Sequence, residues 1–246
     1  MDRTQRLDKY LSGMGICSRR NVEQFLKGQN LSINGRRVIE PGTRLNIKTA
    51  TVTLNGVLFK KPKLVYYMLN KPAEVISTVS DEFGRKNVVS LVPSKQRIFP
   101  VGRLDKDTTG LIILTNDGEL TNLLTHPRHE VHKTYILVAG GRVNERQLER
   151  LQTGVELEDG LTAPAGVRVL RQEGKTTVIQ MSIHEGKNRQ IRRMCESVKI
   201  HLIALERVKF GPIFLGDLKE GRCRELTDKE VSLLRKAGKS SPASSH

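Results

Sequence analysis

The order of strand-like and helix-like stretches is the feature that most restricts how this chain can fold. The stretch "LVYYML" at residues 64–69 has the apolar pattern of a strand. Further strand patterns lie near residues 111–115, 133–139, 166–171, 176–183 and 202–209, and helix patterns near 119–125, 144–152, 188–198 and 228–236. Thr227 and Glu230 have the spacing of a capping box at the start of the last helix. Because several strands are joined by hairpins and the helices are irregularly interspersed, we predict an α+β fold with a mainly antiparallel mixed sheet.

The first sixty residues carry a separate, smaller pattern. Apolar side chains from Leu7 to Met14 follow helical spacing, and Ser18 is a suitable N-cap for a second helix. The dipeptide Asn34-Gly35 then divides an alternating stretch, which is typical of a tight hairpin. We therefore predict a small α/β domain over residues 1–60, a larger domain over 61–237 and a flexible tail over 238–246.

The charge of the chain indicates a polyanionic partner. It has 42 Lys and Arg residues against 26 Asp and Glu, which leaves a formal net charge of +16. The first sixty residues alone hold eleven basic and four acidic side chains. Because each phosphate neutralised by a basic side chain releases counterions, such an excess favours binding to a nucleic acid.

The sequence indicates neither a membrane partner nor an oxidising compartment. No apolar run approaches the roughly 18 residues of a spanning helix, and the first residues lack the hydrophobic core of a signal peptide. Cys17, Cys195 and Cys223 are far apart and do not have the paired spacing of a metal site. We expect a cytoplasmic protein that holds no metal.

An acidic loop in front of an apolar strand is the main candidate for chemistry. In "PVGRLDKDTTGLIIL", Gly102 and Gly110 flank a polar loop that contains Asp105 and Asp107. A polar loop on a rigid strand is a good place to hold a reacting group. The distant stretch "EGKNRQIRRM" supplies arginines, and an arginine beside a partly buried aspartate keeps it ionised and fixes its orientation.

Simpler interpretations of the acidic loop remain open. The aspartates and the following threonines could merely cap a turn before the strand. A calcium loop is rejected because its twelfth position holds Asn116 instead of a bidentate Glu. A glycosidase-like pair of carboxylates is possible in principle, although the spacing of Asp105 and Asp107 alone fixes no stereochemistry.

Several motifs resemble those of one enzyme family. The pair "GRLDKDTTGLIILTNDGEL" and "EGKNRQIRRM" resembles the RsuA family of ribosomal-RNA pseudouridine synthases. "HKTYILVAGG" and "GPIFLGDLKEGRCRELTDKEV" are similar to further parts of that family. The leading segment "RLDKYLSGMGICSRRNVEQFLKGQNLSINGRRV" resembles an S4-like RNA-binding domain, which precedes the catalytic domain in that family. Together these motifs cover nearly the whole chain in the expected order.

The resemblance implies an isomerisation without a cofactor. Uracil is detached from C1′ of its ribose, turned over and rejoined through C5, with Asp105 as the catalytic aspartate. A carboxylate can attack or deprotonate the sugar and can stabilise positive charge near C1′, and the choice between these routes stays open. The resemblance makes Arg192 the ion-pair partner of Asp105, although Arg192 could instead only contact a phosphate.

The resemblance also assigns residues around the target nucleotide. Tyr135 would stack on the extruded base, unless it is simply a core residue of its strand. Arg103 would take the place of the flipped nucleotide, and Ile191 would pack under the base or belong to the core. Further RNA contacts are expected at Arg6, Lys9, Ser18, Arg19, Arg20 and Asn34 in the first domain and at Lys187, Arg189 and Arg193 in the second.

Asp8 and a group of histidines have other expected roles. Asp8 lies in a second "RLDK" stretch without an apolar strand behind it, so we expect it to favour the dipole of a helix by lying in its first turn. His126, His129 and His132 recur every third residue, but Pro127 interrupts the helix that would align them as metal ligands. We therefore interpret them as loop histidines near the RNA.

The sequence thus predicts a monomeric pseudouridine synthase that acts on ribosomal RNA. The stretches "GICSRR" and "NRQIRRMCE" favour relatives that act on large-subunit RNA, either free or in an assembling ribosomal subunit. The main alternative is a non-catalytic RNA-binding or ribosome-assembly factor on the same scaffold. A glycoside hydrolase is a third possibility, but it leaves the positive charge unexplained.

Overall fold

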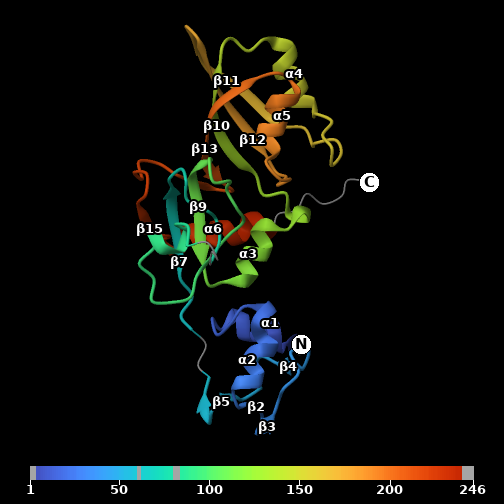
Figure 1. The fold of residues 1–246 in the computed structure, drawn as a ribbon, viewed down its shortest axis with the longest axis vertical. Helices are drawn as coiled ribbons and strands as arrows, with labels where there is room; N and C mark the ends of the chain where they lie inside the picture. The colour runs from blue at the N-terminus through green and yellow to red at the C-terminus, as the bar shows by residue number, and fades with distance from the viewer. Residues whose placement is uncertain (1–3, 60–61, 80–83, 240–246) are drawn as a thin grey trace. The chain divides into compact units, whose positions relative to one another are not determined.

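The computed structural model describes residues 4–59, 62–79 and 84–239. They form two compact units (Figure 1). The first contains the chain up to residue 65 together with 94–98 and 116–118, and the second contains the remainder. Lys60 and Lys61, at the predicted domain boundary, lie outside the described residues, as do residues 240–246 of the predicted tail.

The first unit combines two short helices with small sheets. Its elements are β1 (Thr4–Arg6), α1 (Leu7–Gly13), the 3-10 turn η1 (Arg19–Asn21), α2 (Val22–Gly28), β2 (Leu31–Ile33), β3 (Arg36–Arg37), β4 (Arg44–Asn46), β5 (Val52–Leu54) and β6 (Val57–Leu58). The strands pair in the order β3-β2-β5-β6, and β1 pairs with β4. Leu7, Leu11, Val22 and Leu26 of the helices pack with Leu31 and other apolar strand residues to form the core.

Two features of the first unit test the sequence prediction. Asn34 and Gly35 join β2 to β3 with φ of 51° and 79°, as a two-residue hairpin turn requires, so the predicted hairpin is confirmed. Ser18 does take an N-cap position, but that of η1 and not of α2, and its side chain accepts no capping hydrogen bond. The chain enters a 3-10 turn there, in which the Ser18 carbonyl accepts from the Asn21 N–H at 3.0 Å.

The second unit is built on one large mixed sheet. Its elements are β7 (Tyr66–Lys71), η2 (Val89–Leu91), β8 (Phe99–Pro100), β9 (Thr109–Thr115), α3 (Gly118–Thr125), η3 (Pro127–His129), β10 (Lys133–Gly140), α4 (Glu145–Thr153), β11 (Gly166–Glu173), β12 (Thr176–Ile183), α5 (Gln190–Ser197), β13 (His201–Phe210), β14 (Ile213–Phe214), β15 (Cys223–Glu225) and α6 (Asp228–Lys239). The strand order is β11-β12-β10-β13-β9-β7-β15, with β14 on β13 and β8 on β9. Only β13 and β9 pair in parallel among the described strands, which confirms the predicted α+β class.

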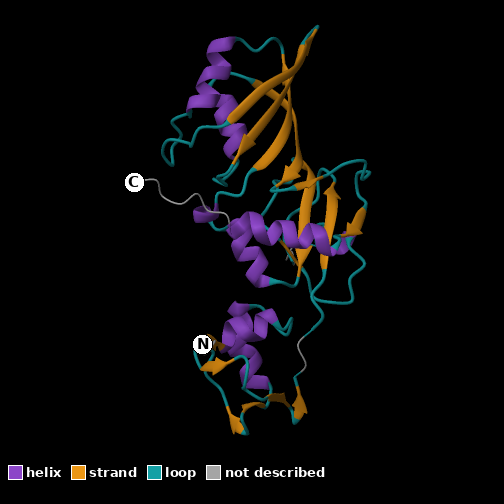
Figure 2. Cartoon of the chain, turned by 180° about the vertical axis from the view of Figure 1, so that it is seen from behind, coloured by secondary structure: helices purple, strands orange, loops and turns teal. Residues whose placement is uncertain are grey.

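Helices lie against both halves of this sheet. Figures 1 and 2 show α4 and α5 beside the half formed by β10, β11 and β12, and α3 and α6 beside β7 and β9. The main core of that second half joins Leu120 and Leu124 of α3 and Leu234 of α6 to apolar residues of β7 and β9. All of β9 from Gly110 to Thr115 is buried. The strand behind the acidic loop is therefore rigidly held.

The limits of two helices depend on local backbone chemistry. At the start of α6, Thr227 N–H donates to Glu230 and Glu230 N–H donates to Thr227 Oγ1, so the predicted capping box is confirmed. The helix runs to Lys239 and so includes the first two residues of the predicted tail. Helix α5 begins at Gln190, later than predicted, because Arg189 adopts a left-handed conformation with φ of 46°.

Candidate active site

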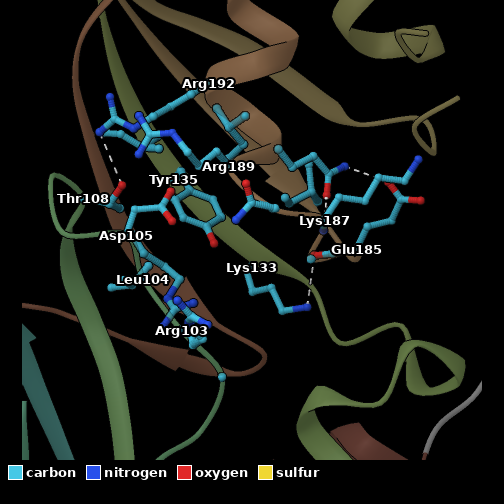
Figure 3. A pocket seen from close by; sticks show the side chains of 18 of the residues that line it. Arg103, Leu104, Asp105, Thr108, Lys133, Tyr135, Glu185, Lys187, Arg189 and Arg192 are labelled. Atoms are coloured by element: carbon cyan, nitrogen blue, oxygen red, sulfur yellow. Dashed lines mark hydrogen bonds between the residues drawn. The ribbon is translucent and has the colours of Figure 1, made fainter. Parts of the chain in front are cut away.

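A pocket of about 420 Å³ opens in the second unit (Figure 3). Residues 101–105 and Thr108 form one wall, and the segment 185–189 with the first turn of α5 forms another. The floor comes from β10, β12 and β13. Arg103, Asp105, Tyr135, Ile191 and Arg192 all line this pocket, so the structure brings together the five residues predicted to surround the target nucleotide.

Strand pairing aligns the side chains of the floor. Tyr135 on β10 lies opposite Arg207 on β13, and Lys133 lies opposite Ile183 on β12. Arg207 in turn pairs with Gly110 at the start of β9, which directly follows the acidic loop. Since directly opposed residues in an antiparallel pair point to the same face, Tyr135 and Arg207 share the face that lines the pocket.

Asp105 lies at the start of a turn that is anchored on both sides. Thr108 N–H donates to the Asp105 carbonyl at 3.1 Å. The preceding Leu104 is buried, and its N–H and carbonyl both bond to the Ser77 hydroxyl, at 3.1 and 2.8 Å. Asp105 is half-buried, and Figure 3 shows its carboxylate pointing into the pocket toward Tyr135. Among the described residues this carboxylate has no hydrogen-bond or ion-pair partner.

The structure corrects the predicted partner of Arg192. The Arg192 Nε atom lies 3.3 Å from Oδ2 of Asp107, and its Nη2 donates to the Asp107 carbonyl at 2.9 Å. Arg189 adds two hydrogen bonds to the same carboxylate, at 3.3 and 3.1 Å. The predicted pairing of Arg192 with Asp105 is therefore wrong in this structure. The turn directs the side chain of Asp107 toward α5 and that of Asp105 into the pocket.

These arginines keep Asp107 ionised. Burial raises the pKa of the Asp107 carboxyl, but hydrogen bonding from Arg189 and the charge of Arg192 outweigh burial and leave that pKa below its ordinary value. In contrast, the carboxylate predicted to react makes no ion pair within the described residues, although its charge acts on Arg189 and Lys71 from a distance. Arg189, the residue before α5, and Arg192 within it thus hold the loop through Asp107 and leave Asp105 available to a ligand.

A buried lysine beneath the loop was missed by the sequence analysis. The Lys71 ammonium is fully buried and donates to the carbonyls of Pro72, Val75 and Lys106, at 2.9, 2.7 and 3.2 Å. Burial lowers the pKa of Lys71 to about 8, although Asp107 and Asp105 oppose that shift. A lysine at the end of a buried apolar strand is unusual, and this was a signal available in the sequence.

Two further cations of the floor were also missed. Lys133 donates to the carbonyls of His184 and Glu185, at 3.0 and 3.3 Å. Burial and the neighbouring Arg207 lower the pKa of Lys133 to about 8. Arg207 is only 2% exposed, its Nε donates to the Leu111 carbonyl at 2.7 Å, and its Nη2 atom has no partner among the described residues.

Other predicted contacts of the second unit are engaged within the protein. Lys187 donates to the carbonyls of Asp159, Gly160 and Leu161, at 3.2, 2.8 and 3.0 Å. Arg193 binds the Asp159 carboxylate through two hydrogen bonds of 2.8 and 2.9 Å. Both side chains therefore hold the 159–161 loop, and RNA binding by them stays a prediction.

In the first unit, Asp8 organises part of the predicted RNA surface. It lies in the first turn of α1, as predicted, and is buried. Its carboxylate is 3.2 Å from Arg6 Nε and 3.0 Å from Arg19 Nη2. Burial raises the pKa of Asp8, but the hydrogen bonds from Arg19 and Arg6 leave it below its ordinary value. Lys9 and Arg20 are exposed and have no side-chain partner among the described residues.

The histidines form a mainly exposed cluster at η3 and the start of β10. His126 Nδ1 accepts from the Arg128 N–H at 3.3 Å, and the rings of His126 and His129 are 6.0 Å apart. The His132 ring lies 5.5 Å from that of His184. Across the residues that the structure describes, no three His, Cys, Asp or Glu side chains are grouped to hold a metal ion. No helix in the described ranges is long and apolar enough to span a membrane.

Comparison with known proteins gives consistent matches along the chain. The sequence model of a family described as RNA pseudouridylate synthase matches residues 65–197, and that of the S4 domain matches residues 5–49. A "Ribosomal large subunit pseudouridine synthase B" of Bacillus subtilis (strain 168) is 41% identical, over 94% of this chain and 96% of that protein. An "Uncharacterized RNA pseudouridine synthase" of Aquifex aeolicus (strain VF5) is 38% identical, over 94% of each chain. A crystal structure of a pseudouridylate synthase matches with a TM-score of 0.68 and 27% identity, over 93% of this chain and 99% of that one.

Proposed function

Since the chain belongs to the RNA pseudouridylate synthase family, we propose that it converts specific uridines of large-subunit ribosomal RNA to pseudouridine with Asp105 as the catalytic carboxylate. Isomerisation of uridine in RNA follows from the family. The ribosomal substrate is supported by the relative from Bacillus subtilis, whose name refers to the large ribosomal subunit. The role of Asp105 is supported by its position in the pocket.

The single observation that carries the catalytic proposal is the unpaired carboxylate of Asp105 in a pocket whose other charged lining residues are six cations and Glu185. Asp105 has no hydrogen-bond or ion-pair partner among the described residues, whereas Asp107 two residues later binds Arg189 and Arg192. An unpaired carboxylate beside an aromatic ring can lie within reach of C1′ of a nucleotide whose base stacks on that ring. It can attack C1′, or it can remove a proton from the sugar.

The remaining pocket residues position the target nucleotide in this proposal. Tyr135 provides the stacking surface for the extruded uracil, and Ile191 supports the base from α5. Arg103 is exposed at the mouth of the pocket and takes the space that the nucleotide leaves in the RNA. Arg192 acts on the geometry of the loop through Asp107.

The first domain, residues 1–60, anchors the RNA and the second, residues 61–237, performs the reaction. This division is supported by the basic character of the first sixty residues and by the S4 match. Basic residues at helix ends can address phosphates and 2′-hydroxyls by shape. The enzyme acts as a cytoplasmic monomer without a cofactor, on free RNA or an assembling subunit, and contributes to ribosome biogenesis.

The experiment that tests the substrate is a map of modified positions. Pseudouridines in ribosomal RNA are mapped in cells with the gene, without it, and with a plasmid copy. We expect at least one large-subunit pseudouridine to disappear on deletion and to return with the plasmid. An unchanged large-subunit map would refute the proposed substrate, and a change confined to small-subunit RNA would replace it.

A further inference from the structure

A buried arginine at the floor of the pocket has a donor with no partner. Arg207 is 98% buried, yet its Nη2 atom makes no hydrogen bond within the described residues. Its Nε donates to the Leu111 carbonyl, and its guanidinium carbon lies 5.1 Å from the centre of the Phe210 ring. A buried charged donor without an acceptor destabilises the folded protein, because nothing replaces the hydrogen bonds that the donor makes to water when it is exposed. Such a group is expected where a ligand supplies the acceptor.

The sheet fixes where this donor lies. Arg207 is directly opposite Tyr135 on β10 and directly beside Gly110 on β9. A Cβ atom on Gly110 would lie 2.3 Å from the Arg207 carbonyl oxygen, so only glycine allows the two strands to approach this closely. The backbone of Arg207 is therefore held between the strand of Tyr135 and the strand that follows the acidic loop, and its guanidinium lies at the pocket floor against the Leu111 carbonyl and the Phe210 ring.

A second uncompensated cation reinforces the charge of the floor. Lys133 lies two residues before Tyr135 on the same strand, and its ammonium donates to two main-chain carbonyls. Burial, and to a lesser extent the charge of Arg207, lower the pKa of Lys133. Within the described part of the chain, neither cation lies in an ion pair with a carboxylate. This floor therefore favours a ligand that carries or develops negative charge.

The depth of Arg207 in the pocket decides whether it can reach the phosphates of an RNA or the carbonyl oxygens of a base. Backbone phosphates are reached by exposed side chains at the mouth, such as Arg103 and Arg189. The base that stacks on Tyr135 reaches the floor, and its acceptors are the carbonyl oxygens O2 and O4. A charged donor beside the stacked ring therefore meets the base and not the backbone.

We propose that the Arg207 guanidinium donates to a carbonyl oxygen of the target uracil and stabilises the negative charge that this base takes up when it leaves the ribose. The proposal rests on the proposed function of the pocket and assigns it a site for the leaving group. The C1′–N1 bond breaks and its electron pair remains on the base, spread over N1, O2 and O4. The C5–C1′ bond then forms, C5 loses its proton and N1 gains one, so the product is an isomer of the substrate. A donor preorganised toward developing charge acts most strongly in a buried site.

The test compares the variants Arg207→Gln and Arg207→Lys with Arg168→Gln, an exposed arginine on β11 of the same sheet. The RNA is a fragment that carries the uridine identified by the mapping experiment. We expect Arg207→Gln to lower kcat by about 100-fold or more, as loss of one such donor does elsewhere, with little change in KM or in the Kd for RNA. Arg207→Lys restores part of kcat because it keeps the charge, and Arg168→Gln matches the unmodified enzyme.

A second RNA, with 5-fluorouridine at the target position, separates a chemical role from a structural one. Fluorine withdraws electrons, so the departing base needs less stabilisation by the protein. In single-turnover consumption of the target nucleoside, the deficit of Arg207→Gln should shrink by about tenfold, equivalent to ~1.4 kcal/mol. An equal deficit on both RNAs would overturn the proposal.

Folding and the proposed function are controlled separately. If Arg207→Gln unfolds at a lower temperature, the two-RNA comparison is made with Arg207→Lys, whose smaller deficit should also shrink on the 5-fluorouridine RNA, and an equal deficit on both RNAs would again overturn the proposal. Activity of the unmodified enzyme and inactivity of Asp105→Asn on the same RNA establish the proposed function. Against that background, the result for Arg207 decides only whether it contacts the leaving base.

Discussion

Arg192 binds Asp107, whereas Asp105, two residues earlier, points into the pocket without a partner. The two carboxylates follow one another across a single turn, but they face different surroundings. Two arginines of the segment that opens α5 hold Asp107, and this arrangement fixes the loop through a carboxylate that does not itself line the pocket. The carboxylate that holds the loop and the carboxylate proposed to react are therefore different residues.

Replacing Asp107 should change activity far less than replacing Asp105. The carboxylate is 43% exposed, so its ion pairs contribute about 0–1 kcal/mol to the free energy of unfolding. We expect Asp107→Asn to lower kcat by about tenfold, ~1.4 kcal/mol in the barrier, because the loop is held less firmly. The matched control is Asp159→Asn, which removes a similar pair with Arg193. An Asp107→Asn enzyme without any activity would show that Asp107 takes part in the chemistry.

Lys71 should give the stability a recognisable pH dependence. Its pKa is about 8 in the folded protein and about 10.4 in an unfolded chain, so between these values the unfolded state binds more protons. Stability from this group therefore rises with pH across that window, by up to about 1.4 kcal/mol per pH unit. At pH 7 Lys71 is charged in both the folded and the unfolded state, so the full free-energy cost of burying its charge lowers the stability.

The variant Lys71→Met isolates this contribution. Removal of the Lys71 ammonium leaves buried carbonyls without a donor, so we expect the free energy of unfolding at pH 7 to fall by about 1–3 kcal/mol. The difference between the two proteins should then widen as the pH rises from 8 to 10.5. Denaturant unfolding at a series of pH values measures both effects. A difference that stays constant with pH would mean that Lys71 is not titrating in this range.

Tyr135 should act through its ring and not through its hydroxyl. Within the described residues its hydroxyl has no hydrogen-bond partner, and base stacking on an aromatic ring is worth about 1–3 kcal/mol. We expect Tyr135→Leu to lower kcat/KM by roughly 10- to 100-fold, the equivalent of that energy. Tyr135→Phe keeps the ring and should stay within a few-fold of the unmodified enzyme. Equal losses in both variants would point to a role for the hydroxyl instead.

Lys9 and Arg20 should contribute more to RNA binding than Arg6 and Arg19, which are paired within the protein. Arg6 and Arg19 are bound to Asp8, whereas Lys9 and Arg20 have no partner among the described residues. The double variant Lys9→Gln/Arg20→Gln should reduce the slope of log K against log salt concentration by about 1–2 units. Lys27→Gln is the control, since Lys27 binds Glu23 within α2. A slope unchanged in the double variant would remove these residues from the RNA surface.

The sequence predicted the elements that depend on local signals. The Asn34-Gly35 hairpin and the Thr227–Glu230 capping box follow from short-range chemistry, and both are confirmed. The start of α5 was predicted too early, because nothing in the sequence marks Arg189 as left-handed. Ser18 takes the N-cap position of a 3-10 turn instead of α2, and its main-chain carbonyl, not its side chain, accepts from the Asn21 N–H group.

The partners within the site could not be predicted in the same way. Asp105 and Asp107 have similar neighbours in sequence, and only the folded turn shows which one faces Arg192. Arg207 becomes a pocket residue through the register of β10, β13 and β9, which joins segments about seventy to a hundred residues apart. Lys133 looked like an ordinary basic residue in a basic chain, whereas Lys71 could have been noticed because it lies at the end of an apolar strand. Their significance comes from burial, which sequence spacing does not reveal.

The most direct test of the account is pseudouridine formation by Asp105→Asn in the full-length enzyme on its mapped RNA. The substitution preserves the size of the side chain and removes the carboxylate. We predict that pseudouridine formation is abolished, with the Kd for RNA and the melting temperature close to those of the unmodified protein. Turnover equal to that of the unmodified enzyme would contradict it.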